Sequence, residues 1–210
     1  GNNKAVQSIT RSNSLFISAA SQAGHPVLSK IYGYFQDFIN FVPGTPLGAN
    51  RVLERLNQDT DLKKKTEDFL RWADTGVASM EINEEAVPDD PNLAEFFKAI
   101  SKYVGDEDFK APTSRLVATL GHLGEQGAIL PLNFSDESHG TTHLFQLLPS
   151  VLDALRTGST LVLDEITTSL HTLLSSRLIR LFTDPETNPH AAQLMFSTHD
   201  TNLLSDQLLR

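Results

Sequence analysis

Two short apolar runs that alternate with helical patterns limit the fold of this chain more than any other feature. The runs are TLVLD at 160–164 and AQLMFST at 192–198, and each has the length of a buried strand. Apolar residues recur at helical spacing over 142–156, before the first run, and over 169–182, between the two. This order of helix, strand, helix and strand is typical of an α/β layer with parallel strands. We therefore predict an α/β fold with a parallel sheet here.

Helical patterns dominate the earlier part of the chain. They cover residues 26–42, 59–73 and 92–105. The acidic, proline-broken stretch 81–91 between them is predicted to be a loop. We therefore expect two domains: a mostly helical lobe over 1–115, and the part with parallel strands over 116–210.

Composition excludes several classes of protein. The chain has no cysteine, so it forms no disulfide and no thiolate metal site of its own. Its formal net charge of −9 gives no bulk basic surface, so charge does not support nucleic-acid binding. No apolar run approaches the roughly 20 residues that span a bilayer, so no membrane partner is expected. We expect a cytoplasmic protein.

Polar side chains follow both predicted strands. Asp164 and Glu165 end the first, and His199 follows the second. Ligands in parallel α/β sheets bind beyond the carboxyl ends of the strands, so Glu165 and His199 are expected to emerge on the same rim if the strands are neighbours. There the first carboxylate would orient Mg²⁺ or its water, the second would polarise a nucleophilic water, and the histidine would donate to a developing phosphoryl oxygen.

A small polar turn precedes the helical pattern at 142–156. It contains Ser138, Gly140 and Thr141. Free backbone N–H groups and the positive end of the helix dipole favour a phosphate at such a place, and a glycine lets it approach closely. Each of these pieces alone is also typical of a helix cap or an ordinary strand end, and it is their joint order and spacing that favours a site.

Three stretches resemble the motifs of one ATPase group. LVLDEITTSLH resembles the Walker B motif and D-loop of ABC/SMC-type ATPases, ESHGTT a degenerate ABC signature, and QLMFSTHDTNLL the H-loop strand with its switch histidine. The nearest likeness is to the AAA-type, ABC-like ATPases of bacterial abortive-infection and overcoming-lysogenization-defect systems. The resemblance implies a P-loop-NTPase-like (ABC ATPase) half-core with a mostly helical inserted lobe, binding ATP and Mg²⁺.

The resemblance also implies residue roles. Asp164 takes the place of the Mg²⁺-supporting aspartate, Glu165 that of the catalytic base, and His199 that of the histidine that contacts the γ-phosphate. Ser138 and Gly140 take the places of signature residues that reach the partner's ATP across a dimer. The D-loop comprises Ser169, Leu170 and His171, of which Ser169 and His171 are expected to contact the nucleotide. This chain has Thr167 and Thr172 where relatives usually carry Asp and Pro.

The phosphate-binding loop of these ATPases does not occur in the sequence. No G-x-x-x-x-G-K-[ST] occurs, so nothing here wraps the β-phosphate or supplies its lysine. We therefore expect this chain to be the later part of a larger protein.

Three functions agree with these patterns. The first is an ATPase that forms a homodimer or higher homo-oligomer on ATP and controls an effector nuclease or toxin in phage defence. The second is an SMC-type head for DNA repair or chromosome maintenance, which long flanking heptad coiled coils would favour. The third is a non-catalytic interaction module with a degenerate nucleotide site.

Overall fold

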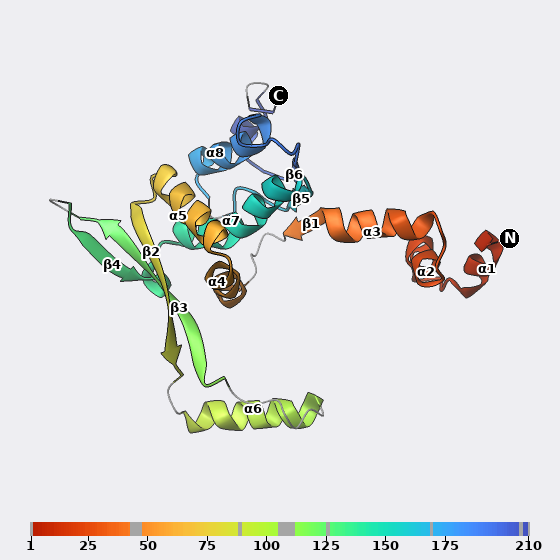
Figure 1. Ribbon diagram of the computed structural model, residues 1–210, viewed down its shortest axis with the longest axis horizontal. Helices are drawn as coiled ribbons and strands as arrows, with labels where there is room; N and C mark the ends of the chain where they lie inside the picture. The colour runs from red at the N-terminus through yellow and green to blue at the C-terminus, as the bar shows by residue number, and fades with distance from the viewer. Residues whose placement is uncertain are drawn as a thin grey trace. The chain divides into compact units, whose positions relative to one another are not determined.

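The chain separates into two compact units that are not continuous in sequence. A computed structural model describes residues 2–42, 48–87, 90–104, 112–124, 127–168, 170–205 and 208–209 (Figure 1). One unit combines the two ends of the chain, residues 1–46 and 150–210, and the other is residues 47–149. The second boundary falls inside the helix α7 (His139–Thr157), which continues through Pro149.

The first unit contains a parallel sheet of three strands in the order β1-β5-β6. The strands are β1 (Ile39–Val42), β5 (Thr160–Leu163) and β6 (Gln193–Phe196). The central strand pairs Leu163 with Val42 on one side and with Phe196 on the other. The unit also holds α1 (Asn2–Ile9), α2 (Phe16–Gln22), α3 (Leu28–Phe38), α8 (Thr172–Thr183), the short 3₁₀ helix η3 (Thr201–Leu203) and the second half of α7.

The central strand β5 is anchored by apolar burial. Leu161 is fully buried and Leu163 nearly so, as expected for a strand flanked on both edges in a parallel sheet. The same unit buries aliphatic side chains from α7, α8 and η3: Val151, Ala154, Leu178, Ile179 and Leu203. Burying one large aliphatic side chain stabilises a fold by about 1.5–3 kcal/mol. The strand that leads to Asp164 is therefore held firmly.

The second unit contains an antiparallel sheet in the order β2-β3-β4. Its elements are α4 (Ala49–Gln58), α5 (Thr60–Trp72), β2 (Val77–Ala86), α6 (Pro91–Val104), β3 (Ser114–Leu123), β4 (Ile129–Asn133), the short 3₁₀ helix η2 (Phe134–Asp136) and the first half of α7. The strands β2 and β3 form a long ribbon, and α6 follows the end where Ala86 pairs with Ser114 (Figure 1).

The predicted loop at 81–91 is wrong over its first part, because β2 runs to Ala86. Charged residues suit this strand because the ribbon exposes them to water. Glu84 and Glu85 are exposed, and Ser114 donates a hydrogen bond to Glu84 across the ribbon. The Nη2 atom of Arg115 lies 3.7 Å from Oε2 of Glu85. Pairing with β3, which is distant in sequence, outweighs the local turn signals.

The predicted helix at 26–42 is too long, because α3 ends at Phe38. Residues 39–42 form β1 instead and pair in parallel with β5, more than a hundred residues later in the chain. Apolar spacing alone does not separate the end of an apolar helix from a short buried strand.

The expected α/β class, with a parallel sheet and helices, is confirmed. Helices expected at 59–73, 92–105, 142–156 and 169–182 are present as α5, α6, α7 and α8. The compact units have their boundaries after residues 46 and 149. Compact units are defined by contacts and need not coincide with domains. The proposed domain boundary between residues 115 and 116 therefore stays a prediction.

Candidate functional site

The carboxyl ends of β5 and β6 lie side by side. The strands are parallel neighbours, and Leu163 pairs with Phe196 at their last position. The chain then presents Glu165 after β5 and His199 after β6, with 3.0 Å between Glu165 Oε1 and His199 Nε2. Both side chains thus emerge on the same rim of the sheet, as the sequence indicates. Glu165 is partly covered, with 31% of its side chain exposed, whereas the His199 side chain is 91% exposed.

Ser197 connects the two carboxylate-bearing residues. Its hydroxyl donates a hydrogen bond of 2.7 Å to Asp164 Oδ1, and its oxygen accepts one of 2.7 Å from the backbone N–H of Glu165. Glu165 has a φ of 58°, in the left-handed region that L-residues rarely adopt. Such a conformation persists only where the surroundings hold it, and it often occurs at functional sites.

The backbone around Asp164 is tied to both neighbouring strands. The Asp164 N–H donates to the Val42 carbonyl at 3.3 Å, and the Ile166 N–H donates to the Ser197 carbonyl at 3.0 Å. These bonds extend the pairing of the sheet past the last strand residue. The Asp164 carboxylate therefore starts from a fixed backbone position.

Further along, two threonines bond to the segment that carries His199. Thr167 Oγ1 lies 3.3 Å from Thr198 Oγ1, and the Thr172 hydroxyl donates to Asp200 Oδ2. The Thr172 hydroxyl lowers the pKa of the Asp200 carboxyl, as does the hydrogen bond from the Asn202 backbone. Two positions at which the sequence departs from the family pattern thus join the predicted D-loop region to the histidine segment.

His171 caps the helix α8. Its Nδ1 atom accepts a hydrogen bond of 3.3 Å from the Leu173 N–H, which fixes the side chain at the start of the helix. Leu170 is buried. Ser169, the other D-loop residue predicted to bind nucleotide, lies outside the described residues. Nucleotide contacts by Ser169 and His171 stay predictions.

Ser138, Gly140 and Thr141 lie at the start of α7, as the sequence indicates. Ser138 Oγ accepts from the Thr141 N–H at 3.1 Å and lies 2.9 Å from Thr141 Oγ1, so its hydroxyl acts as a helix cap. Thr141 is buried. These residues belong to the second unit, and their role toward a partner's ATP stays a prediction.

A model of a protein family matches residues 50–205, which include both strand ends and the start of α7. The family is described as an AAA domain, the proposed AbiEii toxin, of type IV toxin–antitoxin systems. The chain belongs to this AAA domain family. The abortive-infection resemblance is thereby confirmed, and the parallel sheet with its helices is consistent with a P-loop-NTPase-like AAA fold. No curated protein and no solved structure was found to match the chain.

The membership indicates that this AAA domain is an ATPase-like module. Such modules work with nucleotide and Mg²⁺, and the carboxylates at the strand ends suit that metal chemically. Mg²⁺ is usually held by one or two carboxylates together with waters and substrate phosphates. Over the described ranges, no three His, Asp or Glu side chains converge on one point, which a site made of protein ligands alone would need. The assignment of Asp164 to Mg²⁺ stays a prediction.

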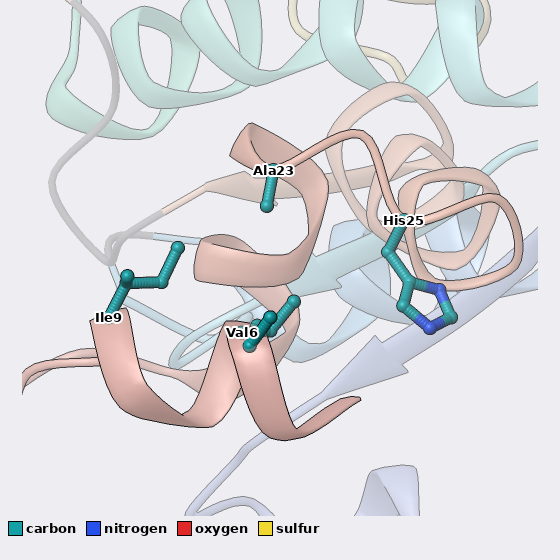
Figure 2. A pocket seen from close by; sticks show the side chains of 5 residues that line it. Val6, Ile9, Ala23 and His25 are labelled. Carbon is teal, nitrogen blue, oxygen red and sulfur yellow. The ribbon is translucent and has the colours of Figure 1, made fainter. Parts of the chain in front are cut away.

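One cavity lies near the N-terminal helices, outside the residues that the family model matches. It has a volume of about 240 Å³ and is lined by Ala5, Val6, Ile9, Ala23 and His25 (Figure 2). Its lining residues come from α1 and from the end of α2 onward, and none of them belongs to the strand ends. No helix in the described part of the chain combines the length and apolarity needed to cross a membrane.

The sequence interpretation missed several residues of this site. Ser197 lies within the predicted strand at 192–198 and has no predicted role, and Thr167 and Thr172 are departures from the family pattern. A buried pair in the second unit was also missed: His122 Nε2 lies 2.6 Å from Glu137 Oε1, and only 3% of the Glu137 side chain is exposed. Glu137 directly precedes Ser138, so this pair anchors the cap of α7 to β3. Only its place in the ESHGTT stretch could have pointed to it.

Proposed function

We propose that this chain is the hydrolytic part of an ABC-like ATPase that binds and hydrolyses ATP. The contact between Glu165 and His199 carries the proposal. It brings a carboxylate and an imidazole together at the carboxyl ends of neighbouring parallel strands, where α/β folds bind their ligands. The family membership supports an ATPase-like module in the same place.

Each side chain has a distinct chemical task in this proposal. Asp164, whose Oδ1 is held by Ser197, presents its carboxylate to Mg²⁺ or to a water bound to it. Glu165 accepts a proton from the attacking water, as a general base does. His199 donates a hydrogen bond to the phosphoryl oxygen on which charge develops. When bound, Mg²⁺ supplies further neutralisation of the charge on the phosphates.

His199 has to exchange partners in order to act. A carboxylate only accepts hydrogen bonds, so the 3.0 Å contact with Glu165 requires the proton of His199 to be on Nε2. The same N–H would donate to a phosphoryl oxygen. Because the His199 side chain is 91% exposed, little holds it in place and it is able to turn toward a nucleotide. Nucleotide binding would thus free Glu165 to receive a water.

The proposal extends to assembly and partners. Ser138 and Gly140 would contact the ATP of a second copy, so ATP would favour a homodimer or higher homo-oligomer in the cytoplasm. That assembly would control an effector nuclease or toxin in phage defence, in keeping with the toxin–antitoxin description of the family. Sedimentation of the Glu165→Gln protein with and without ATP tests the first step. A mass that ATP leaves unchanged would contradict it.

Hydrolysis is tested on the protein as its gene encodes it, because these 210 residues contain no glycine-rich lysine loop. Glu165→Gln should lower the hydrolysis rate by about 10²-fold or more, the usual contribution of a general base, and leave ATP binding intact. Glu186→Gln, at an exposed glutamate of the same unit, is the matched control and should hydrolyse normally. If the wild-type protein neither binds nor hydrolyses ATP, the proposal is wrong and a non-catalytic interaction module becomes the better reading.

A further inference from the structure

Ser197 makes two hydrogen bonds with one hydroxyl group. A carboxylate only accepts and a backbone N–H only donates, so the direction of both bonds follows from their partners. The Glu165 N–H donates to Ser197 Oγ, and Ser197 Oγ donates its proton to Asp164 Oδ1, each at 2.7 Å. The side chain of Ser197, directly after β6, therefore connects both carboxylate residues at the end of β5.

The first bond acts on Glu165. Its left-handed backbone, with a φ of 58°, is unfavourable for a residue with a side chain and needs support from its surroundings. The N–H of Glu165 takes its direction from this backbone geometry, and Ser197 Oγ is the acceptor that receives it. The hydroxyl thus stabilises the turn that brings the Glu165 carboxylate to His199.

The second bond acts on Asp164. With Oδ1 bonded to Ser197, the rotation of the carboxylate is restricted and Oδ2 is left for a cation. Mg²⁺ demands near-ideal octahedral geometry, so the orientation of a carboxylate that serves it matters. Groups that orient metal ligands typically change metal affinity or activity by about 10–100-fold when they are removed.

The hydroxyl is not needed to pair the strands. Both backbone groups of Ser197 are already bonded to the β5 segment, its N–H to the Leu163 carbonyl at 3.1 Å and its carbonyl to the Ile166 N–H at 3.0 Å. Ser197 is also exposed, so replacing it removes little buried surface. A variant that lacks only the hydroxyl should therefore fold.

We propose that Ser197 is the positioning residue of this site, which sets the backbone of Glu165 and the carboxylate of Asp164 at once. The inference rests on the proposed function, because it assigns Ser197 a part in ATP hydrolysis. Ser197 acts through its two neighbours and needs no contact with the nucleotide itself. Threonine carries the same hydroxyl, so Ser197→Thr should preserve both bonds, whereas Ser197→Ala removes both.

The test compares Ser197→Ala, Ser197→Thr and a control, Ser205→Ala at an exposed serine of the same unit. For Ser197→Ala we expect kcat to fall by about tenfold or more, and the Mg²⁺ concentration for half-maximal activity to rise by about tenfold. The KM for ATP should stay within about twofold, since the bonds orient the hydrolytic groups only. Ser197→Thr and Ser205→Ala should match the wild type.

Amide hydrogen exchange of Glu165 gives a readout that does not depend on activity. Exchange should be faster in Ser197→Ala than in the wild type, and unchanged in Ser197→Thr. Wild-type kcat in Ser197→Ala, or a Ser197→Thr variant as impaired as Ser197→Ala, would overturn the inference. If the wild-type protein hydrolyses no ATP, the proposed function fails. The exchange rates still decide whether Ser197 positions Glu165, and an unchanged rate in Ser197→Ala would show that it does not.

Discussion

Glu165 Oε1 and His199 Nε2 are 3.0 Å apart, although 34 positions of sequence separate their residues, because β5 and β6 are parallel neighbours. The contact is exposed on the histidine side, and exposed ion pairs contribute little to stability. His199→Ala should therefore change the free energy of unfolding by no more than about 0.5 kcal/mol. Under the proposed function it should lower the rate of ATP hydrolysis by about 10²-fold, because it removes a donor to the transition state.

A double-mutant comparison checks whether the two residues act together. Residues that act as a unit are strongly non-additive, so Glu165→Gln with His199→Ala should hydrolyse ATP no more slowly than Glu165→Gln alone. Urea unfolding and steady-state hydrolysis are measured on all three variants. A large loss of stability in His199→Ala would indicate a structural role for the histidine.

Replacing Gly158, between α7 and β5, by a residue with a side chain should destabilise the fold. Its φ is 69°, and a Cβ atom there would lie 2.5 Å from the His190 carbonyl oxygen. Gly24 has nearly the same φ, 68°, but open space around it. Gly24→Ala should therefore cost about 1–2 kcal/mol from backbone conformation alone. Gly158→Ala should cost about 1–3 kcal/mol more, because overpacking adds to the same backbone cost. Equal losses in urea unfolding would show that the His190 loop moves aside freely.

The position of the candidate site could be predicted because its signals are local. Short apolar runs that end in polar residues mark Asp164 and His199, and parallel pairing then brings strand ends together wherever the strands are neighbours. The same local reasoning failed for β1 and β2. Their residues pair with partners far along the chain, and no spacing or turn signal within 39–42 or 77–86 reports such a partner.

The details that hold the site could not be predicted for a related reason. A serine at a strand end has many uses, and its bonds to Asp164 and Glu165 depend on the register between two strands. The left-handed backbone of Glu165 is also invisible in the sequence, because glycine, not glutamate, is the usual residue there. Residue types predicted what chemistry is present, and only the fold shows which groups orient it.

Thr172 should set the acidity of Asp200. Its hydroxyl is the largest cause of the lowered pKa of that carboxyl, followed by the Asn202 backbone N–H. Thr172→Val keeps the shape of the side chain and removes the hydroxyl, so the Asp200 pKa should rise toward its ordinary value of 3.8. Titration of the Asp200 carboxyl carbon by NMR measures the shift. Thr168→Val, at an exposed neighbouring threonine, should leave it unchanged.

The lowered pKa of Asp200 also makes the free energy of unfolding depend on pH. A carboxyl whose pKa is lowered in the folded protein stabilises the fold above the unfolded value, near 3.8, and this contribution is lost as the pH falls through the lowered pKa. Thr172→Val should therefore narrow the stability difference between pH 6 and pH 3. An equal acid sensitivity in both proteins would mean that Asp200 does not contribute.

His143 should make the protein less stable in mild acid. Burial in the first turns of α7 lowers its pKa below the ordinary 6.5, because the charged imidazolium loses hydration there. As the pH falls below 6.5, the unfolded chain binds a proton at this position more readily than the folded protein does, so the free energy of unfolding decreases. His143→Gln cannot take up that proton, and it should lose less stability between pH 7.5 and pH 5 than the wild type loses. His139→Gln, at an exposed position of the same helix, is the matched control for the substitution itself. Urea unfolding at both pH values measures the difference, and a His143→Gln protein as acid-sensitive as the wild type would assign the effect to other groups.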